Sequence, residues 1–207
     1  AEQVYSIPND DLYLVGTSEV SLAAYHGESV LNLEDLPKRY AGFSTCFRRE
    51  AGTYGKDTSG IFRVHQFDKV EMFSFCNPDN SKEEHDFLLS IEEEILQELA
   101  IPYRVVDVCS GDLGASAAKK YDIEAWIPSQ EQYREVTSCS NTTDYQSRRL
   151  NIRTKLEKNS TFLHTLNGTA LAVGRILIAL LENNQQEDGS VAFDESVANI
   201  VGIEKLS

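Results

Sequence analysis

Arg48 and Glu50, an arginine and a glutamate two residues apart, are a pair of charged residues that could carry chemistry. If the pair lies on a strand, the two side chains share one face. A guanidinium can grip a phosphate through two parallel charge-assisted hydrogen bonds, and a carboxylate can accept from an amino group such as that of adenine. The alternative is an ordinary salt-bridged hairpin, because charges on a strand face are usually only solvated. The pair alone leaves both interpretations open.

The pair lies in a stretch that runs from Phe47 to Glu71, FRREAGTYGKDTSGIFRVHQFDKVE. This stretch predicts a hairpin, with one strand ending over 47–50 and a second strand over 62–75. Both arms are rich in aromatic or β-branched residues and are bounded by glycine. The glycine-rich connection, 52–60, carries its own charges, and loops of this length are usually functional or disordered.

Two further groups have a functional and an ordinary interpretation. Thr17, Ser18 and Glu19 precede a predicted helix over 20–25, and such residues commonly cap or begin a helix. Arg175 lies in the apolar segment 170–181. A buried arginine needs an ionic partner or a bound anion, so an internal salt bridge remains the alternative to an anion site.

Glu135 and Ser138 lie on a predicted strand over 133–140. A carboxylate and a hydroxyl are suitable hard oxygen ligands for a magnesium ion that bridges phosphates. On a regular strand the two side chains point to opposite faces, so sharing one ion requires a bulge or a strand end between them. A surface strand with ordinary polar residues is the alternative.

The remaining elements follow from the spacing of apolar residues and from the capping, glycine and proline residues that bound each segment. A helix is predicted from a capping box of Ser81 and Glu84 up to Pro102, with its apolar stripe inward and its glutamates on the other face. A long apolar helix is predicted over 170–183, after a glycine turn at 167–169. The other predicted strands cover 5–15, 103–109, 121–127 and 161–166.

Composition limits the class of protein. At 207 residues and 41% hydrophobic, the chain can bury one core, and we expect one domain over 1–207. The net charge of -14 argues against a general nucleic-acid binder. Four scattered cysteines without a CxxC pair favour a reducing cytoplasm over a disulfide framework or structural zinc. No apolar run is long enough to span a bilayer and no signal peptide begins the chain, so we expect a cytoplasmic protein without membrane attachment.

The stretch 47–71 closely resembles the second signature motif of class II aminoacyl-tRNA synthetases, in the version of the seryl-tRNA synthetases. Residues 17–19 are similar to the Thr-x-Glu loop of these enzymes, and residues 135–138 to their Glu-x-x-Ser run. The segment 161–183, which contains Arg175, is similar to the third signature motif. The resemblance implies an α+β fold with an antiparallel sheet flanked by helices, and the strand-rich middle of the chain agrees with it.

The resemblance also implies a reaction: ATP-dependent activation of L-serine to seryl-adenylate, then transfer to the 3′ end of tRNA(Ser). Positioning and charge neutralisation would supply the rate, with Arg48, Arg175 and Glu135 as the catalytic residues. The implied ATP contacts are Arg48, Arg49, Glu50, Val64, Phe67, Glu135, Val136, Thr137, Ser138 and Arg175. The implied serine contacts are Thr17, Ser18, Glu19, Arg48, Glu71, Asn167 and Thr169, and Glu135 and Ser138 would hold Mg²⁺.

The N-terminal tRNA-binding arm and the first signature motif of a complete seryl enzyme have no counterpart in this sequence. We therefore expect the C-terminal catalytic part of a longer chain, with a homodimer as the full-length enzyme. In the family, the loop of the second motif meets the acceptor end of tRNA, which implicates Arg49 and Lys56. A non-catalytic synthetase-like regulator and an aminoacyl–carrier-protein ligase are the alternative functions.

Overall fold

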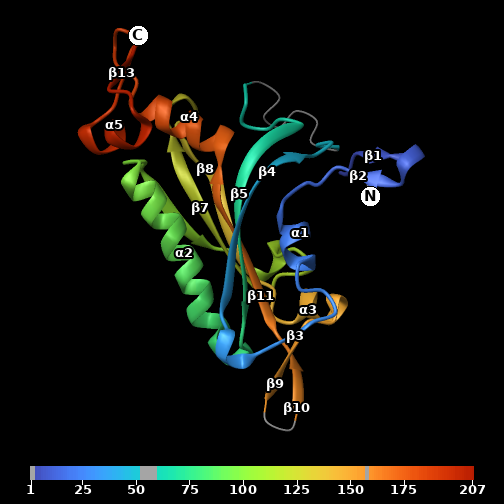
Figure 1. Ribbon diagram of the computed structural model, residues 1–207. Helices are drawn as coiled ribbons and strands as arrows, with labels where there is room; N and C mark the ends of the chain where they lie inside the picture. The colour runs from blue at the N-terminus through green and yellow to red at the C-terminus, as the bar shows by residue number, and fades with distance from the viewer. Residues whose placement is uncertain (1–2, 52–59, 157–158) are drawn as a thin grey trace.

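The structure is a computed structural model that describes residues 3–51, 60–156 and 159–207. Its centre is a sheet of six strands in the order β4-β5-β11-β8-β7-β6, and every neighbouring pair is antiparallel (Figure 1). The antiparallel sheet flanked by helices is therefore confirmed. The strands of this sheet are β4 (Lys38–Phe47), β5 (Gln66–Cys76), β6 (Tyr103–Asp107), β7 (Lys119–Ile127), β8 (Gln132–Asn141) and β11 (His164–Ala172).

Helices cover both faces of the sheet (Figure 1). On one face, α2 (Ser81–Glu98) and α4 (Val173–Asn183) share a hydrophobic core with β7. On the other face, β5 packs against α1 (Glu19–Ala24) and the segment that follows α3 (Tyr145–Leu150), through Phe73 and Phe75. Met72 and Cys76 of β5 pack with Leu88 of α2 on the first face, so alternating positions of β5 serve two different clusters, as the period of two in a strand requires.

Short elements surround this framework. A second sheet joins β3 to β9 in parallel and β9 to β10 in antiparallel fashion, and two small hairpins pair β1 with β2 and β12 with β13. Their bounds are β1 (Ser6–Ile7), β2 (Leu12–Tyr13), β3 (Val30–Leu31), β9 (Arg153–Leu156), β10 (Asn159–Phe162), β12 (Val191–Ala192), α5 (Glu195–Val201) and β13 (Lys205–Leu206). The 3₁₀ turns are Pro8–Asp10, Leu33–Asp35, Pro78–Asn80, Ser110–Asp112 and Pro128–Gln130.

Several predicted boundaries are wrong. Residues 5–15 form a two-stranded hairpin around the Pro8–Asp10 turn and not one strand. The second arm of the main hairpin begins at Gln66, so residues 62–65 precede the strand. The segment 167–169 is not a turn but part of β11, because both β5 and β8 pair with it. The last long helix consequently begins at Val173, and Arg175 lies in its first turn.

The predicted capping box of α2 is also wrong. Ser81 is the first helical residue, and its side chain caps nothing at the helix start. Glu84 instead accepts hydrogen bonds of 2.7 Å from Arg39 Nε and Nη2 and one of 2.6 Å from Ser74 Oγ. Glu84 and Glu92 are both buried, so the glutamates of α2 do not all lie on its solvent face.

The Glu84 network yields a prediction about acid stability. Burial acts to raise the pKa of Glu84, but the hydrogen bonds from Arg39 and Ser74 outweigh it and the pKa is lowered. A lowered pKa stabilises the fold above the ordinary carboxyl value of about 4.3, and this stabilisation is lost as the pH falls through the folded value. We expect Glu84→Gln to cost about 1–2 kcal/mol at neutral pH, and less on acidification.

Urea unfolding of the wild type and Glu84→Gln, from neutral pH to below the ordinary carboxyl value of about 4.3, measures this loss of stability. Glu83→Gln is the matched control, because Glu83 is exposed and lies in the same helical turn. An equal pH dependence in both variants would contradict the role of Glu84.

None of the helices in the described ranges is long and apolar enough to cross a membrane. All four cysteines are free thiols, with Cys46, Cys76 and Cys139 buried and Cys109 exposed.

Candidate active site

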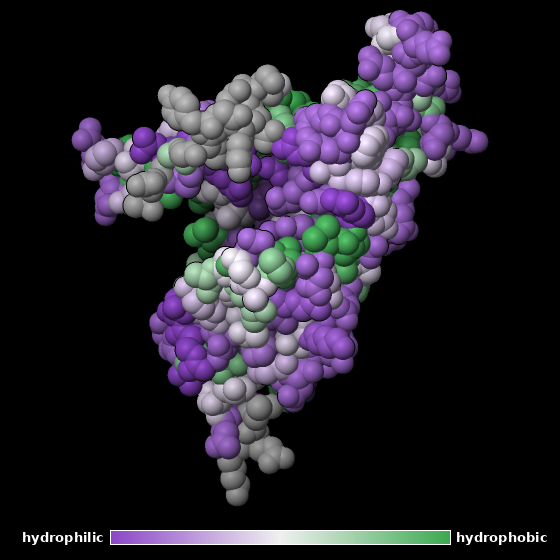
Figure 2. Space-filling view, turned by 180° about the vertical axis from the view of Figure 1, so that it is seen from behind, coloured by the Kyte–Doolittle hydropathy of each residue, from purple (hydrophilic) through white to green (hydrophobic). Residues whose placement is uncertain are grey.

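A cavity of about 370 Å³ opens on the α1 face of the sheet, at the end where β4 leaves it and α4 begins. Figure 2, which views the molecule from behind, shows a hollow with mainly hydrophilic walls between the β1–β2 hairpin and α4. All residues that the resemblance assigns to ATP or serine line this cavity except Ser18 and Arg49. The predicted residues that line it are Thr17, Glu19, Arg48, Glu50, Val64, Phe67, Glu71, Glu135, Val136, Thr137, Ser138, Asn167, Thr169 and Arg175.

Arg48 and Glu50 reach the cavity by a different geometry from the one expected. Strand β4 ends at Phe47, so the pair lies beyond it, and Glu50 has a left-handed φ of 49°. Arg48 Nε donates to the carbonyl of Gly16 at 3.1 Å, and its guanidinium lies 5.1 Å from the ring centre of Phe67. A change of chain direction therefore brings both charges to the cavity, and strand alternation does not.

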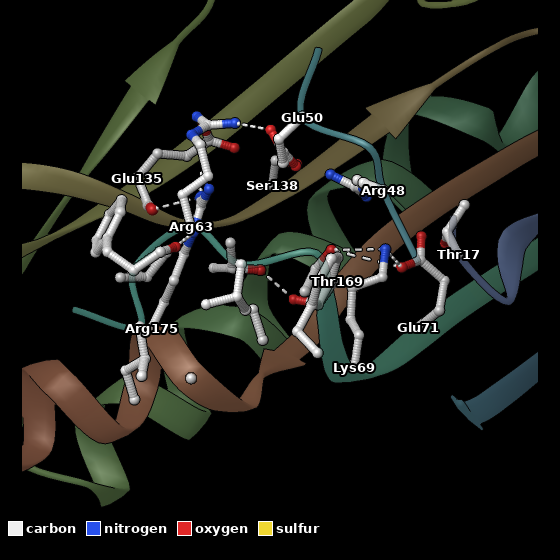
Figure 3. A pocket seen from close by; sticks show the side chains of 18 of the residues that line it. Thr17, Arg48, Glu50, Arg63, Lys69, Glu71, Glu135, Ser138, Thr169 and Arg175 are labelled. Atoms are coloured by element: carbon white, nitrogen blue, oxygen red, sulfur yellow. Dashed lines mark hydrogen bonds and ion pairs between the residues drawn. The ribbon is translucent and has the colours of Figure 1, made fainter. Parts of the chain in front are cut away.

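Glu50 is paired with a cavity arginine that has no predicted role. Its Oε2 accepts from Arg63 Nη1 at 2.7 Å, and Figure 3 shows the two side chains facing each other across the cavity mouth. Arg63 belongs to the segment before β5, which returns from the main hairpin loop. If Glu50 accepts a hydrogen bond from adenine, as the sequence predicts, it does so while it is paired with Arg63.

The β8 strand carries the bulge that a shared Glu135–Ser138 site requires. Thr137 is opposite Ile123 while Glu135 is opposite Glu124, so Val136 is one extra residue without a cross-strand partner. An extra residue shifts the alternation of side chains by one position. Glu135 and Ser138 therefore line the same cavity although they are three residues apart.

Arg175 projects from the first turn of α4 toward Glu135 (Figure 3). Its Nη1 donates to the Glu135 carbonyl at 2.8 Å, and its Nε donates to the Phe62 carbonyl at 3.4 Å. The nearest carboxylate contact, with Glu135 Oε2, is 4.0 Å long. Burial lowers the pKa of Arg175; Glu135 opposes this effect, and the positive charges of Arg63, Arg48 and Arg134 add to it.

Like charges so close together repel one another in a site of low dielectric, so a bound anion would relieve their repulsion. The first turn of α4 strengthens this preference, because no side chain caps it and Gly174 lies in the cavity wall. Free backbone N–H groups at a helix N-terminus attract phosphate. This end of the cavity is therefore suited to a polyanion.

The other end of the cavity is built around Glu71, whose side chain is 1% exposed. It forms an ion pair with Lys69, accepts from Asn167 Nδ2 at 3.2 Å, and has Thr169 Oγ1 at 3.5 Å. Figure 3 shows Lys69, Glu71 and Thr169 together on the side of the cavity away from Arg175. This end offers a carboxylate, an amide and a hydroxyl for a small polar ligand.

Glu19 lies near the Glu71 end and accepts from Gln146 Nε2 of α3 at 2.7 Å. Burial raises the pKa of Glu19, the charge of Glu71 raises it further, and Gln146, Lys69 and Arg48 act in the opposite direction. A ligand cation beside Glu19 would offset both unfavourable effects. The α-ammonium group of an amino acid is such a cation.

Lys69 is the main cavity residue without a predicted role. The sequence does indicate that Lys69 lines the cavity. Phe67, Lys69 and Glu71 occupy alternating positions of one strand and so share a face. The hydrophobic wall of the cavity also has no predicted counterpart. It is formed by Ile61, Phe62 and Ala172.

Two predicted contacts lie away from the cavity lining. Ser18 is buried and its hydroxyl donates to the Gly42 carbonyl at 2.9 Å, which ties the start of α1 to β4. Arg49 is exposed. Lys56, which the resemblance links to tRNA, lies outside the described residues. The roles predicted for these three residues stay predictions.

The sequence matches a family model described as the tRNA synthetase class II core domain (G, H, P, S and T) over residues 4–184. The chain belongs to this family. In this chain, residues from all the segments that resemble the family's motifs line one cavity.

Relatives and solved structures agree with this assignment. The serine–tRNA ligases of Thermobifida fusca and Corynebacterium kroppenstedtii are 59% and 58% identical over 207 residues, which are 100% of this chain and 49% of each relative. Seryl-tRNA synthetase from Pyrococcus horikoshii, complexed with ATP, has a TM-score of 0.94 at 51% identity and covers 99% of this chain and 46% of that one. The cytoplasmic serine–tRNA ligase of Naegleria fowleri, in complex with AMP, has a TM-score of 0.93 at 42% identity, over 100% of this chain and 50% of that one. The chain spans about half the length of the curated relatives it matches.

Proposed function

We propose that this class II core activates L-serine with ATP and passes the seryl group to the 3′ end of tRNA(Ser). The observation that carries the proposal is the division of one cavity into an arginine-rich end and a carboxylate-rich end. Such a cavity suits a nucleotide joined to a small amino acid whose ammonium and hydroxyl groups need acceptors. The names of the relatives, and the ATP and AMP in the related structures, support the same assignment.

In the first step, an oxygen of the serine carboxylate attacks the α-phosphorus of ATP. The bond from that phosphorus to the oxygen bridging to the β-phosphate breaks, and pyrophosphate leaves. Arg48 is assigned to the α-phosphate, and Arg175 and Arg63 to the departing pyrophosphate. The residues perform no covalent chemistry; they hold the reactants in line and offset negative charge.

The serine subsite uses the opposite end. Glu19 and Thr17 are assigned to the α-ammonium side of the substrate, and Glu71 and Thr169 to its side-chain hydroxyl. Alanine would leave the buried Glu71 carboxylate without that hydrogen bond. An unmade hydrogen bond to a buried charged group is costly, which gives discrimination against amino acids without a hydroxyl.

Magnesium fits the residues at the β8 bulge. Glu135 and Ser138 line the same cavity and offer carboxylate and hydroxyl oxygens, which Mg²⁺ prefers. In the described ranges, no group of three or more His, Cys, Asp or Glu is arranged to hold a metal ion, so phosphate and water oxygens would complete the coordination. When bound, Mg²⁺ would supply charge neutralisation for the phosphates.

The second step and the setting of the protein belong to the same proposal. A hydroxyl of the terminal ribose of tRNA(Ser) attacks the seryl carbonyl carbon, the bond from this carbon to the phosphate oxygen breaks, and AMP and the hydroxyl proton leave. Arg49 and Lys56 are the residues assigned to the tRNA end. A homodimer of the complete enzyme and a cytoplasmic location are further parts of the proposal. The related Naegleria fowleri enzyme is described as cytoplasmic, which supports the location.

Serine-dependent exchange of labelled pyrophosphate into ATP tests the proposal. We expect exchange with serine and at least about 100-fold less with alanine or glycine, because these substrates leave Glu71 unpaired. Exchange with alanine but not serine would overturn the assignment of the Glu71 end. Absence of exchange, with stabilisation by ATP or serine retained in a thermal unfolding assay, would favour the non-catalytic regulator.

A further inference from the structure

Glu92 is a buried titratable residue that the proposed reaction does not use. It lies in the middle of α2, on the face of the sheet opposite the cavity, and it is 0% exposed. Both of its carboxyl oxygens are buried without a hydrogen-bond partner among the described residues. A buried carboxylate without a partner is so costly that the neutral acid is the favoured form.

The carboxyl group packs directly against Gly168 of β11. A Cβ atom at Gly168 would lie 2.7 Å from Glu92 Oε1, 3.0 Å from Cys139 Cβ and 3.3 Å from Met72 Cε. Glu92 therefore occupies the space that a side chain at position 168 would need, so an alanine there would force the Glu92 carboxyl group to move.

The neighbours of Gly168 on β11 face the other way, into the cavity. Asn167 and Thr169 both contact Glu71 from this strand. Glu92 thus lies directly behind the segment that carries Asn167 and Thr169, two of the residues predicted to contact serine. Because Gly168 has no side chain, only the backbone of β11 separates Glu92 from the serine subsite.

Gly168 is the last residue of β11 that is paired on both sides, with Met72 of β5 and Cys139 of β8. The paired positions of β11 and β8 end at Gly168 and Cys139, and a hydrogen bond from Thr137 Oγ1 to the Thr169 carbonyl continues the contact beyond them. The pairing of β11 with β5 also shifts register between Thr169 and Leu171. Packing from α2 therefore acts at the last regularly paired residues of β11, just before the pairing with both neighbouring strands becomes irregular or ends.

The groups around Glu92 favour its neutral form. Burial raises the pKa of Glu92 well above its ordinary value, and Glu71 and Asp122 raise it further. Lys69 and the nearby Thr137 hydroxyl act in the opposite direction, but that hydroxyl donates to the Thr169 carbonyl and so leaves the Glu92 oxygens without a donor. These groups come from β8, β5 and β7, and β8 also contributes the buried Cys139 thiol. Strand β11 presents uncharged residues to α2, namely Gly168 beside the carboxyl group, and Leu166 and Ala170.

We propose that Glu92 is a positioning residue for the serine subsite, and that its carboxyl group, packed against Gly168, sets the place of the β11 segment that carries Asn167 and Thr169. The role in serine binding rests on the proposed function. The contact with Gly168 and the protonation of Glu92 do not, so they are tested separately.

The first test compares the wild-type chain with Glu92→Gln in urea unfolding between pH 5 and pH 7. A raised folded pKa stabilises the fold fully only below the unfolded value of about 4.3 and loses this effect as the pH rises toward the folded value. We expect the folding equilibrium constant of the wild type, relative to Glu92→Gln, to fall as the pH rises, by up to about tenfold per pH unit while the folded carboxyl group stays neutral and the unfolded one is ionised. If the ratio of the two folding equilibrium constants does not change with pH, Glu92 is an ordinary carboxylate in the folded chain. This result would overturn the inference that the folded chain holds Glu92 in its neutral form.

The second test is a double-mutant cycle between positions 92 and 168. Gly168→Ala is expected to destabilise the wild type more than it destabilises Glu92→Ala, because the 2.7 Å contact is absent in the second background. If the two substitutions change the free energy of unfolding additively, the packing contact between Glu92 and Gly168 is overturned. Both measurements use unfolding alone and hold whether or not the chain activates serine.

The third test addresses the positioning role through pyrophosphate exchange. Glu92→Ala is expected to raise the KM for serine several-fold and to leave the KM for ATP unchanged, while Glu92→Gln retains the wild-type KM for serine. Equal changes in both KM values would indicate a general structural effect and overturn positioning. If the wild type shows no exchange with serine, the proposed function fails together with this role, while the two unfolding tests still decide the contact and the protonation.

Discussion

Replacing Arg175 with alanine is expected to reduce serine-dependent pyrophosphate exchange by about 100- to 1000-fold or more, because one preorganised donor to developing charge is worth that much. The fold should survive the change. Arg175 contacts the protein mainly through the backbone carbonyls of Glu135 and Phe62, and its side chain retains 22% exposure. Exchange rates with saturating serine, combined with thermal unfolding, measure both effects.

Arg134→Ala is the matched control for this substitution. The Arg134 guanidinium lies 4.3 Å from the ring centre of Phe62, against 4.7 Å for Arg175, but Arg134 does not line the cavity. We expect Arg134→Ala to keep most of the exchange activity. Normal exchange by Arg175→Ala, or an equal loss in both variants, would contradict the assignment of Arg175 to the pyrophosphate.

Replacing Glu71 with alanine is the second substitution with a large expected effect. It removes the acceptor of Asn167 and the ionic partner of Lys69, whose side chain is only 8% exposed. Breaking one side of a buried ion pair costs about 3–5 kcal/mol, because the remaining charge stays buried. We therefore expect Glu71→Ala to lose both stability and exchange with serine, as measured by urea unfolding and by the exchange rate.

A double substitution separates the two losses. Lys69→Met combined with Glu71→Gln removes both charges of the pair, and replacing a buried pair by uncharged groups is often neutral for stability. We expect this variant to recover stability and still lack serine exchange. Recovery of exchange together with stability would show that Glu71 acts only on the fold.

The sequence indicated the components of the site better than their geometry. Arg48, Glu50, Glu71, Glu135 and Arg175 carry chemistry that residue type and motif order reveal, and the structure brings all five to one cavity. Their backbone settings were less predictable. Arg48 and Glu50 lie past the end of a strand, and Glu50 adopts a left-handed conformation that no local rule would assign to glutamate.

The β8 bulge shows why spacing alone was insufficient. Glu135 and Ser138 could share a ligand only if the strand contained an extra residue, and pairing with β7 supplies it at Val136. Likewise, the segment 167–169 reads as a turn because of Asn167 and Gly168, but pairing with β5 and β8 on both sides keeps it in a strand. Tertiary pairing overrides local propensity at both places.

Buried charge was the feature least visible in the sequence. The glutamates of α2 were expected to face solvent, yet Glu84 takes Arg39 and Ser74 as partners and Glu92 enters the space beside a glycine. The partners of these residues lie far away in the sequence. Only the packing of α2 on the sheet reveals them.

The central claim is that this cavity makes seryl-adenylate, and direct detection of that compound tests it most closely. The chain would be incubated with serine, ATP, Mg²⁺ and pyrophosphatase, and the protein-bound small molecules identified by mass spectrometry, with alanine replacing serine in a parallel sample. We predict seryl-adenylate bound to the chain in the first sample and no alanyl-adenylate in the second. Folded chain that retains ATP but forms no adenylate, or that forms alanyl-adenylate as readily, would contradict the account.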